Sequence, residues 1–339
     1  MELPVRIRRT PGPEPVISVD GAWDAPGLNL SHWPGNRTPR ELRHDLSTGV
    51  ALRFARLSPE RRAELASGCV AIVNNHYDTD GSCALFSVRH PSRALALEQA
   101  LLDAAAAGDF YRLPSERAFC IDAIVHGLGD PERSPIALAG LDELARHQAA
   151  TDLLMDELPA ILEGDLTPWR ALWEEPLEAL RADLAALEGC ERDAVAHLDW
   201  TVYAARGPAA ESLDPCRHAL LGTTRSDRVL FLAETLAGTR CRLVIGTLSW
   251  FDLDSRAREP RPRRGELAER LNELEGSDPA GVCAWRAQDI ESPSPELWFG
   301  LAEHEMFADR CPALRPSRIE PARLRREIAD CLRAAAPLP

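Results

Sequence analysis

The sequence contains no lysine, because all 39 of its basic residues are arginine. This absence excludes functions that need a lysine amine, such as a phosphate-binding loop ending in Gly-Lys-Ser/Thr or Schiff-base catalysis. Alanine, leucine and proline are abundant beside the arginine, a composition typical of bacterial genes of high GC content. The use of arginine in place of lysine therefore carries little functional information.

The sequence also lacks the marks of secretion and of membrane insertion. It starts without an apolar leader segment, and no apolar run approaches the length of a membrane span. The nine cysteines are scattered and show no Cys-x-x-Cys spacing. An odd number of dispersed thiols is typical of a reducing compartment, so we expect a cytoplasmic protein without membrane contact.

Positive charge is in deficit: 39 basic residues face 53 acidic ones, and the net charge is −14. This balance argues against broad nucleic-acid binding and against an anionic membrane surface as partner. The 339 residues are enough for one large or two modest domains with a substantial core. Composition changes from helical to β-rich near residue 195, which predicts domains at 1–195 and 196–339.

The pattern from Val70 to Ser82 organises the first region. An apolar, mostly β-branched run predicts a buried strand, six polar residues follow, and Gly81 leads into an apolar helix. A strand, an acidic turn and a helix form half of a βαβ unit. We therefore expect an α/β fold with a Rossmann-like, mostly parallel sheet, flanking helices and a smaller α+β C-terminal region. Residues 1–27 predict an irregular arm with one edge strand in the alternating segment Pro15–Val19.

His76, Asp78 and Asp80 occupy alternate positions of this turn, so in an extended conformation they project to one side. Ligands of open α/β sheets bind at the carboxyl ends of strands, where this turn lies. Two carboxylates and an imidazole suit Mn²⁺, Mg²⁺ or Zn²⁺, and we expect Mn²⁺ or Mg²⁺ as the cofactor. The alternative is a polar loop with solvated aspartates.

Other families carry a similar Asp-x-Asp-Gly motif. A calcium EF-hand loop beginning at His76 would need a bidentate glutamate where Ser87 stands, and it would follow a helix. Haloacid-dehalogenase-like phosphatases carry the motif directly after a strand and usually need a downstream lysine. Here Asn74 to Tyr77 separate the motif from the apolar run, and lysine is absent.

The stretch from His76 to Gly81 resembles the first motif of the DHH phosphoesterases, whose exonuclease branch reads Asp-Tyr-Asp-x-Asp-Gly after a strand. His76 replaces the first aspartate, and Asn74 stands where another branch has a histidine. The resemblance covers about fifteen residues, and no two histidines are adjacent, so the Asp-His-His triplet of the family is missing. It implies metal ligands at His76, Asp78 and Asp80, and a second-motif aspartate, for which Asp109 is the best candidate.

Further site residues are expected on loops and helices. The loop containing His32, Trp33 and Asn36 predicts a functional segment, with His32 positioning substrate or moving a proton; the alternative is a tryptophan anchor with a surface histidine. Gly108 suits a helix end, which leaves Asp109 exposed just beyond it. Asp122 and His126 share a helix face as possible ligands or as capping and solvated residues. His147 is expected to be structural.

The densest basic patch runs from Arg256 to Arg264, and its prolines are expected to hold guanidinium groups outward. Arginine suits bidentate recognition of phosphate, so Arg261 and Arg263 are candidate substrate-binding residues; the alternative is a solvated loop. The sequence thus predicts a divalent-metal-dependent phosphoesterase or related hydrolase that acts on a small phosphorylated substrate, with His32 and His76 as catalytic residues. The alternative is a metal-stabilised binding or regulatory protein that lacks catalysis.

Overall fold

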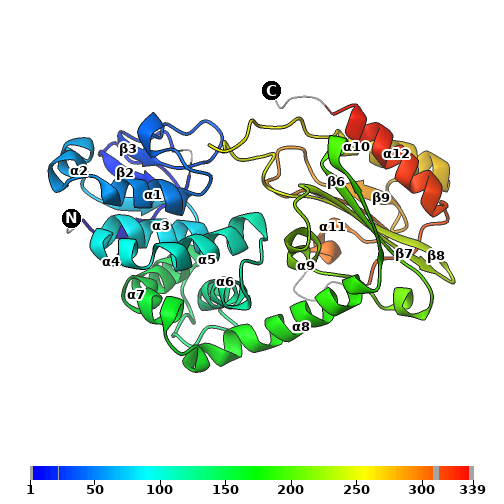
Figure 1. Cartoon of the computed structure of the whole chain (residues 1–339), viewed down its shortest axis with the longest axis horizontal. Helices are drawn as coiled ribbons and strands as arrows, with labels where there is room; N and C mark the ends of the chain where they lie inside the picture. Colours follow the sequence, from blue (N-terminus) through cyan, green and yellow to red (C-terminus); the bar gives the residue numbers. More distant parts are fainter. Residues whose placement is uncertain (1–2, 22, 308–312, 336–339) are drawn as a thin grey trace. The chain divides into compact units, whose positions relative to one another are not determined.

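The computed structural model describes residues 3–21, 23–307 and 313–335, which form two compact units (Figure 1). Unit 1 is Met1–Glu178 together with Phe251–Arg258, and unit 2 is Ala179–Trp250 together with Glu259–Pro339. The boundary expected at residue 195 falls at the end of a strand inside unit 2. No sequence pattern indicates that Phe251–Arg258 belongs to unit 1.

Unit 1 is built on a four-stranded sheet in the order β1-β4-β2-β3, with every neighbouring pair parallel. Its strands are β1 (Val5–Ile7), β2 (Val16–Val19), β3 (Gly27–Leu30) and β4 (Ile72–Asn74). The expected α/β fold with a mostly parallel sheet is confirmed. The expected irregular arm with an edge strand is wrong, because β2 is hydrogen-bonded on both sides and lies inside the sheet.

The first helices of unit 1 lie between β3 and β4 along the chain, and the others follow β4. The helices are η1 (Arg40–Leu42), α1 (Ser47–Arg56), α2 (Pro59–Leu65), α3 (Thr79–Arg89), α4 (Pro91–Ala96), α5 (Glu98–Phe110), α6 (Glu116–Gly129), α7 (Glu143–Glu163), η2 (Thr167–Trp169) and the first half of α8 (Arg170–Glu188). The boundary between the units falls within α8.

Alternation along the strands divides the core of unit 1. Ile17, Val19 and Ile72 join one large cluster with the apolar faces of α1, α3, α5, α6 and α7. Val16 and Val73 point to the opposite face and pack with Trp23 in a small cluster. Most of the apolar burial therefore lies on the helical side of the sheet, which fixes the strand ends against α1, α3 and α5.

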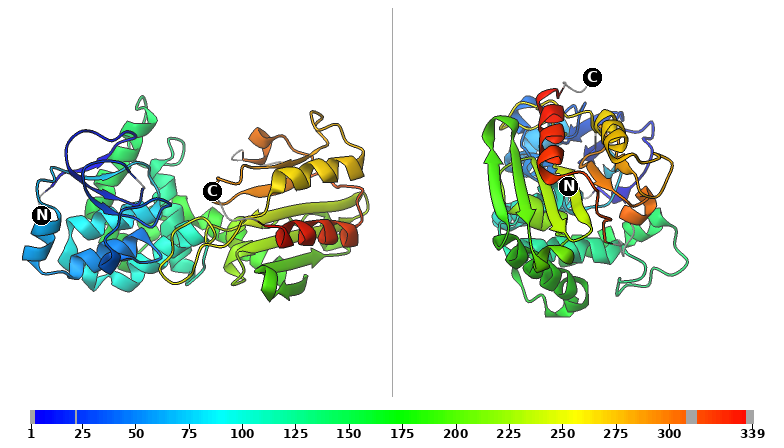
Figure 2. Two further views of the ribbon diagram at one scale, coloured as in Figure 1. Left: turned by 90° about the horizontal axis from the view of Figure 1, so that it is seen from above. Right: turned by 90° about the vertical axis from the view of Figure 1, so that its right-hand side faces the viewer.

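Unit 2 contains a six-stranded mixed sheet in the order β5-β6-β7-β8-β10-β9. Its elements are the end of α8, β5 (Glu191–Val195), η3 (Ala196–Leu198), β6 (Trp200–Ala205), η4 (Pro208–Glu211), α9 (Arg217–Gly222), β7 (Arg228–Thr235), β8 (Gly238–Ile245), α10 (Arg264–Glu275), β9 (Trp285–Ala287), β10 (Glu296–Phe299), α11 (Glu303–Met306) and α12 (Pro321–Arg333). The strands β7 and β8 form an antiparallel hairpin. Helices α10 and α12 cover one face of this sheet through Leu271 and Ile328 (Figure 2).

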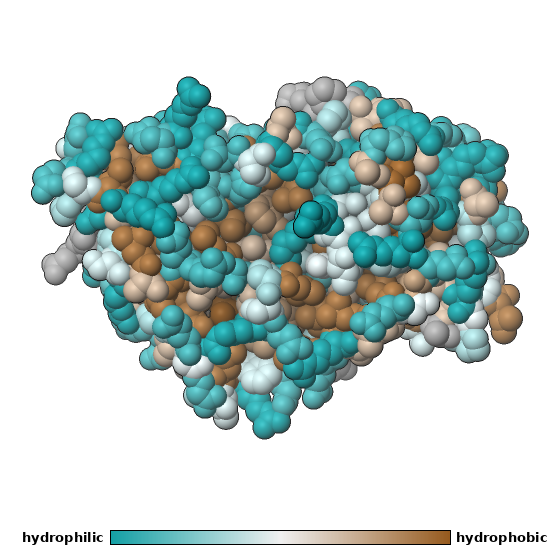
Figure 3. Space-filling model, viewed as in Figure 1, coloured by the Kyte–Doolittle hydropathy of each residue, from teal (hydrophilic) through white to brown (hydrophobic). Residues whose placement is uncertain are grey.

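Polar and charged side chains cover much of the face shown in Figure 3, as the charged composition suggests. The exposed large apolar side chains are scattered along the described chain: Val70, Leu141, Leu236, Leu274, Val282 and Phe307. No helix in the described residues is both long and apolar enough to cross a membrane.

The side chain of Arg261 points into unit 2, which corrects the expectation that it faces outward to bind phosphate. It is 0% exposed, and its guanidinium group donates to Ser249 Oγ and to backbone carbonyls. The carbonyl acceptors belong to Gly246, Ile290, Ser292 and Pro293. Each nitrogen of the guanidinium group therefore donates at least one hydrogen bond, and together these bonds hold the surrounding loops to one another. Arg263 is exposed and pairs with Glu266.

Replacement of Arg261 by methionine should destabilise the protein strongly, because several buried carbonyls lose their donor. We expect the free energy of unfolding to fall by about 3 kcal/mol or more, as for other buried charge networks that lose one partner. The matched variant Arg263→Met should change it by no more than about 0.5 kcal/mol. Urea unfolding followed by circular dichroism measures both, and equal midpoints would contradict the structural role of Arg261.

Candidate metal centre

Three polar residues follow the carboxyl ends of neighbouring parallel strands. Asp20 comes directly after β2, His32 follows β3, and His76 follows β4. Parallel strands bring these ends to one edge of the sheet, where α/β proteins bind ligands. Asp20 has a φ of 55°, in the left-handed region that non-glycine residues adopt rarely and often at functional sites.

Asp78 and Asp80 lie at the start of α3 instead of in an extended turn, which corrects the expected conformation. Asp78 is the N-cap residue, and its Oδ1 accepts a hydrogen bond of 2.8 Å from the backbone N–H of Gly81. Asp80 lies in the first helical turn and is fully buried. The helix therefore begins four residues earlier than the apolar run from Cys83 suggests.

The carboxylate of Asp80 also holds the start of α1. Its two oxygens accept hydrogen bonds of 2.8 Å from the backbone N–H groups of Ser47 and Thr48. A carboxylate at a helix N-terminus is stabilised by these unpaired donors and by the helix dipole. Burial and the neighbouring charge of Asp20 nevertheless raise the pKa of Asp80 to about 6.

Asp109 is buried near the end of α5, so the expectation that it is exposed beyond a helix end at Gly108 is wrong. The helix continues to Phe110, and Tyr111 takes the left-handed conformation at its end. Gly108 serves close packing instead: a Cβ there would lie 2.9 Å from Asp122 Oδ1 and 3.0 Å from Thr79 Cβ. This contact brings α5 against α3 and turns Asp109 toward the cluster.

Six side chains form two groups that share Asp20. Asp20, His32, Asp80 and Asp109 make the buried group, and Asp20, His76 and Asp78 make the partly exposed one. His32 Nε2 lies 3.1 Å from Asp109 Oδ2, 3.5 Å from Asp20 Oδ1 and 3.7 Å from Asp80 Oδ2. His76 Nε2 lies 3.1 Å from Asp20 Oδ2 and 2.9 Å from Asp78 Oδ2.

Both imidazoles are oriented by a second acceptor at Nδ1. His32 Nδ1 lies 2.5 Å from the backbone carbonyl of Asp45, which can only accept, so this nitrogen carries a proton. His76 Nδ1 lies 2.6 Å from Asn75 Oδ1. In both rings Nε2 is thereby left facing the carboxylates. Metal-binding histidines are typically oriented in this way by a carbonyl or amide oxygen.

The charges of the two groups are strongly coupled. Burial alone would lower the pKa values of His32 and His76, but the carboxylates beside them raise both well above the ordinary value. Burial opposes ionisation of Asp20, yet the two imidazoles hold its pKa below the usual range. Burial and Asp80 raise the pKa of Asp109. Because a metal needs neutral imidazole, metal binding would compete with these protons.

The residues present fit a divalent metal ion. Both oxygens of Asp20 and Nε2 of His32 are buried without a well-formed hydrogen bond from the described residues. The ligand atoms of each group lie within 4.8 Å of one another, close to the ~4.2 Å that separates opposite ligands of Mg²⁺. Four carboxylates and two imidazoles suit Mn²⁺ or Mg²⁺. This donor set could hold one or two ions.

The two groups differ in access to solvent. Phe251 stacks on the His32 ring at 3.8 Å and the backbone N–H of Asp252 donates to the His32 carbonyl, so the return segment Phe251–Arg258 covers the buried group. The side chains of His76 and Asp78 are 28% and 26% exposed. His76 also lines a cavity of about 470 Å³ with Tyr77, Leu144 and His147. Access is therefore at His76 and Asp78.

The structure brings together His32, His76, Asp78, Asp80 and Asp109 from the sequence-based set. Asp122 accepts a hydrogen bond from Thr79, with His126 beside it, and the ring of His147 stacks on that of Tyr77. Within the described residues, none of these last three candidates belongs to either group.

Asp20 and Phe251 were missed in the sequence analysis. Asp20 follows an alternating apolar run and precedes Gly21, the same strand-to-turn signal that identified the central turn. It was overlooked because that run was assigned to an edge strand. Phe251 carries no such signal, since its position depends on the return of the chain to unit 1 after Ala179–Trp250 of unit 2, which local patterns do not report. 

Mn²⁺ should raise the melting temperature of the wild type and leave that of Asp20→Asn/Asp78→Asn unchanged. An ion that binds only the folded state stabilises it by ~2.7 kcal/mol at 100 times its dissociation constant. Asp156→Asn removes one exposed carboxylate on α7 and should keep the full shift. Thermal unfolding with EDTA or Mn²⁺ measures this, and an equal shift in all three proteins would exclude the cluster as the site.

Gly81→Ala should disturb the cluster although alanine favours helices. The added Cβ would lie 2.1 Å from Asn74 Nδ2, 2.9 Å from Asp78 Oδ1 and 3.0 Å from Asp20 Oδ2. We expect lower stability in EDTA and a smaller stabilisation by Mn²⁺. The control is Gly265→Ala in the first turn of α10, where a Cβ meets nothing within 4 Å. If both variants behave alike, the close approach at Gly81 is unimportant.

Comparison with known proteins identifies a family and no activity. No curated protein matches this sequence. The model of a family described as "Family of unknown function (DUF6687)" matches residues 6–338, which is nearly the whole chain and both units. The chain therefore belongs to the DUF6687 family.

Proposed function

We propose that the protein is a divalent-metal-dependent phosphoesterase-like hydrolase that acts on a small phosphorylated substrate. The observation that carries this proposal is the position of Asp20 between the two imidazoles. Its Oδ1 faces His32 Nε2 and its Oδ2 faces His76 Nε2, so one carboxylate serves both groups of candidate ligands. Asp20 would therefore help to hold a divalent metal ion in either group, and such ions would supply Lewis-acid chemistry there.

Bound Mn²⁺ or Mg²⁺ would supply a Lewis acid and a water of lowered pKa at this site. The chain supplies the rest of the arrangement. Asp80 and Asp109 are held inside the fold and are suited to fix a permanent ligand shell with His32. His76 and Asp78 stand at the exposed rim, where a substrate oxygen can reach the same centre. Aromatic packing by Phe251 on His32 keeps bulk water from the buried side.

Trp33 and Tyr77 shape the rim. The ring of Trp33 lies 4.9 Å from that of His76, and the hydroxyl of Tyr77 donates to the carbonyl of Val125. Both contacts restrict the residues that flank His76. A rigid rim favours hydrolysis because a reacting group must be held in line with its nucleophile at a separation of about 3–3.5 Å.

The resemblance to the DHH phosphoesterases stays a prediction. Asp20 and His32, which come from segments before the central turn, supply an aspartate and a histidine in a chain that lacks the Asp-His-His triplet. That missing triplet favours the alternative, a metal-stabilised binding or regulatory protein without catalysis. The two functions differ in turnover and agree in metal binding. We also expect a reducing, cytoplasmic environment for the dispersed thiols.

Hydrolysis of bis(p-nitrophenyl) phosphate and of p-nitrophenyl phosphate in Mn²⁺ tests the proposal. We expect turnover by the wild type and by Asp156→Asn, and a loss of about 100-fold or more in Asp20→Asn, because the shared ligand is lost. Nitrophenolate release measures the rate. Metal-induced stabilisation of the wild type without turnover of either ester would support the binding or regulatory protein instead.

A further inference from the structure

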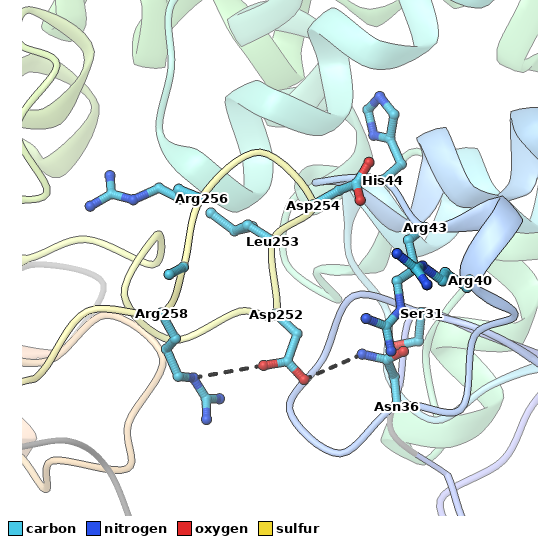
Figure 4. A pocket seen from close by; sticks show the side chains of 11 residues that line it. Ser31, Asn36, Arg40, Arg43, His44, Asp252, Leu253, Asp254, Arg256 and Arg258 are labelled. Atoms are coloured by element: carbon cyan, nitrogen blue, oxygen red, sulfur yellow. Dashed lines mark hydrogen bonds and ion pairs between the residues drawn. The ribbon is translucent and has the colours of Figure 1, made fainter.

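A second cavity of unit 1 carries positive charge. It measures about 500 Å³ and is lined by η1, by the loop after β3 and by the return segment Phe251–Arg258. Its basic residues are Arg40, Arg43, Arg256 and Arg258, with His44 beside them (Figure 4). This concentration of arginine contrasts with the net charge of −14 for the whole chain.

Arg40 begins the short 3₁₀ turn η1, and Arg43 is its C-cap residue, whose backbone N–H donates to the carbonyl of Arg40. Residues three apart in such a turn share one side, and the intervening Leu42 is buried as its anchor. In Figure 4 the two guanidinium groups lie close to each other beside Asn36, with Arg258 on the other side of Asp252. Neither Arg40 nor Arg43 has a side-chain ion pair or hydrogen bond within the described chain.

The two acidic residues of the cavity are occupied by other groups. Asp252 receives Asn36 Nδ2 at 3.4 Å and lies 3.9 Å from Arg258 Nε, and Asp254 lies 3.2 Å from Arg53. These carboxylates therefore leave Arg40 and Arg43 without a counter-charge inside the cavity. Two adjacent guanidinium groups repel each other, and a bound anion would relieve that repulsion.

The cavity adjoins the candidate metal centre through the chain. Ser31, which lines the cavity, is the immediate neighbour of His32. Asn36, also in the lining, donates through Nδ2 to the carbonyl of Trp33, whose ring packs against His76. The cavity is therefore lined by segments that carry or contact candidate metal ligands, which motivates a ligand with two anionic groups, one for each place.

We infer that this cavity binds a second phosphate group of the substrate, with Arg40 and Arg43 as its principal ligands and Arg258 opposite them. Guanidinium groups suit this role because they donate paired hydrogen bonds to phosphate oxygens. The assignment of this phosphate to the substrate rests on the proposed function. The binding of phosphate by the cavity does not depend on it. The inference replaces the expectation of phosphate binding by Arg261 with three other arginines, of which Arg258 comes from the same basic stretch.

Calorimetric titration tests the cavity first without metal. In EDTA at low salt, thymidine 3′,5′-bisphosphate should bind the wild type and bind Arg40→Ala/Arg43→Ala about tenfold more weakly, as expected for the loss of charge-assisted hydrogen bonds. The control Arg61→Ala/Arg170→Ala removes the same charge from two exposed surface pairs of unit 1 and should bind as the wild type does. Equal affinity in all three proteins, or no binding to the wild type, would overturn the inference.

The second titration repeats the comparison in Mn²⁺ with the bisphosphate and with inorganic phosphate. A gain of about tenfold in affinity for the bisphosphate on adding Mn²⁺, lost in Arg40→Ala/Arg43→Ala, would support a substrate that reaches both places. Binding in EDTA without that gain would overturn the assignment to substrate and indicate a free phosphate ligand. Absence of ester hydrolysis would count against the proposed function alone, because the EDTA titration involves no turnover.

Discussion

Unit 1 depends on one electrostatic constraint: the carboxylates of Asp20, Asp80 and Asp109 are buried together and must be neutralised. The burial of like charges is unfavourable, and several neighbouring groups offset the repulsion between these carboxylates. The N-terminus of α1 donates to Asp80, and His32 lies among all three carboxylates. A divalent ion is a stronger counter-charge than an imidazolium, so this cluster could hold a metal ion.

Unit 2 shows how the same chain treats buried charge when the role is structural. Glu296 is 0% exposed and lies between Arg217 and Arg242, which hold its pKa below the usual value despite its burial. Arg261 is equally buried, and its guanidinium nitrogens donate hydrogen bonds to Ser249 Oγ and to four backbone carbonyls. These groups are saturated, whereas the oxygens of Asp20 have no well-formed hydrogen bond from the described residues. Buried charged groups whose polar atoms all have partners serve the fold, whereas a buried carboxylate whose oxygens lack hydrogen bonds is available to a ligand.

Sequence reasoning succeeded where chemistry follows a local pattern. The strand-to-turn signal at Val70–Gly81 located the parallel sheet and three of the candidate ligands, and helix composition led to Asp109 for a reason that the structure corrects. It failed where burial decides the role of a residue. A run of arginine and proline suggests an exposed loop, yet the side chain of Arg261 is buried and bonds several loops together. The short apolar run at Val16–Val19 suggests an edge strand, yet it is an inner strand of the sheet that ends before Asp20.

The return segment Phe251–Arg258 joins these observations, because it belongs to unit 1 while both of its neighbours in sequence belong to unit 2. Asp45 holds it by accepting hydrogen bonds from the backbone N–H groups of Asp254 and Ser255. The segment then covers His32 with Phe251 and lines the arginine cavity with Arg258. The residues before Ala179 therefore contain every candidate metal ligand but not their cover. The buried group can be closed only after the strands β5 to β8 have been synthesised, so the completed site requires the chain that forms the other unit.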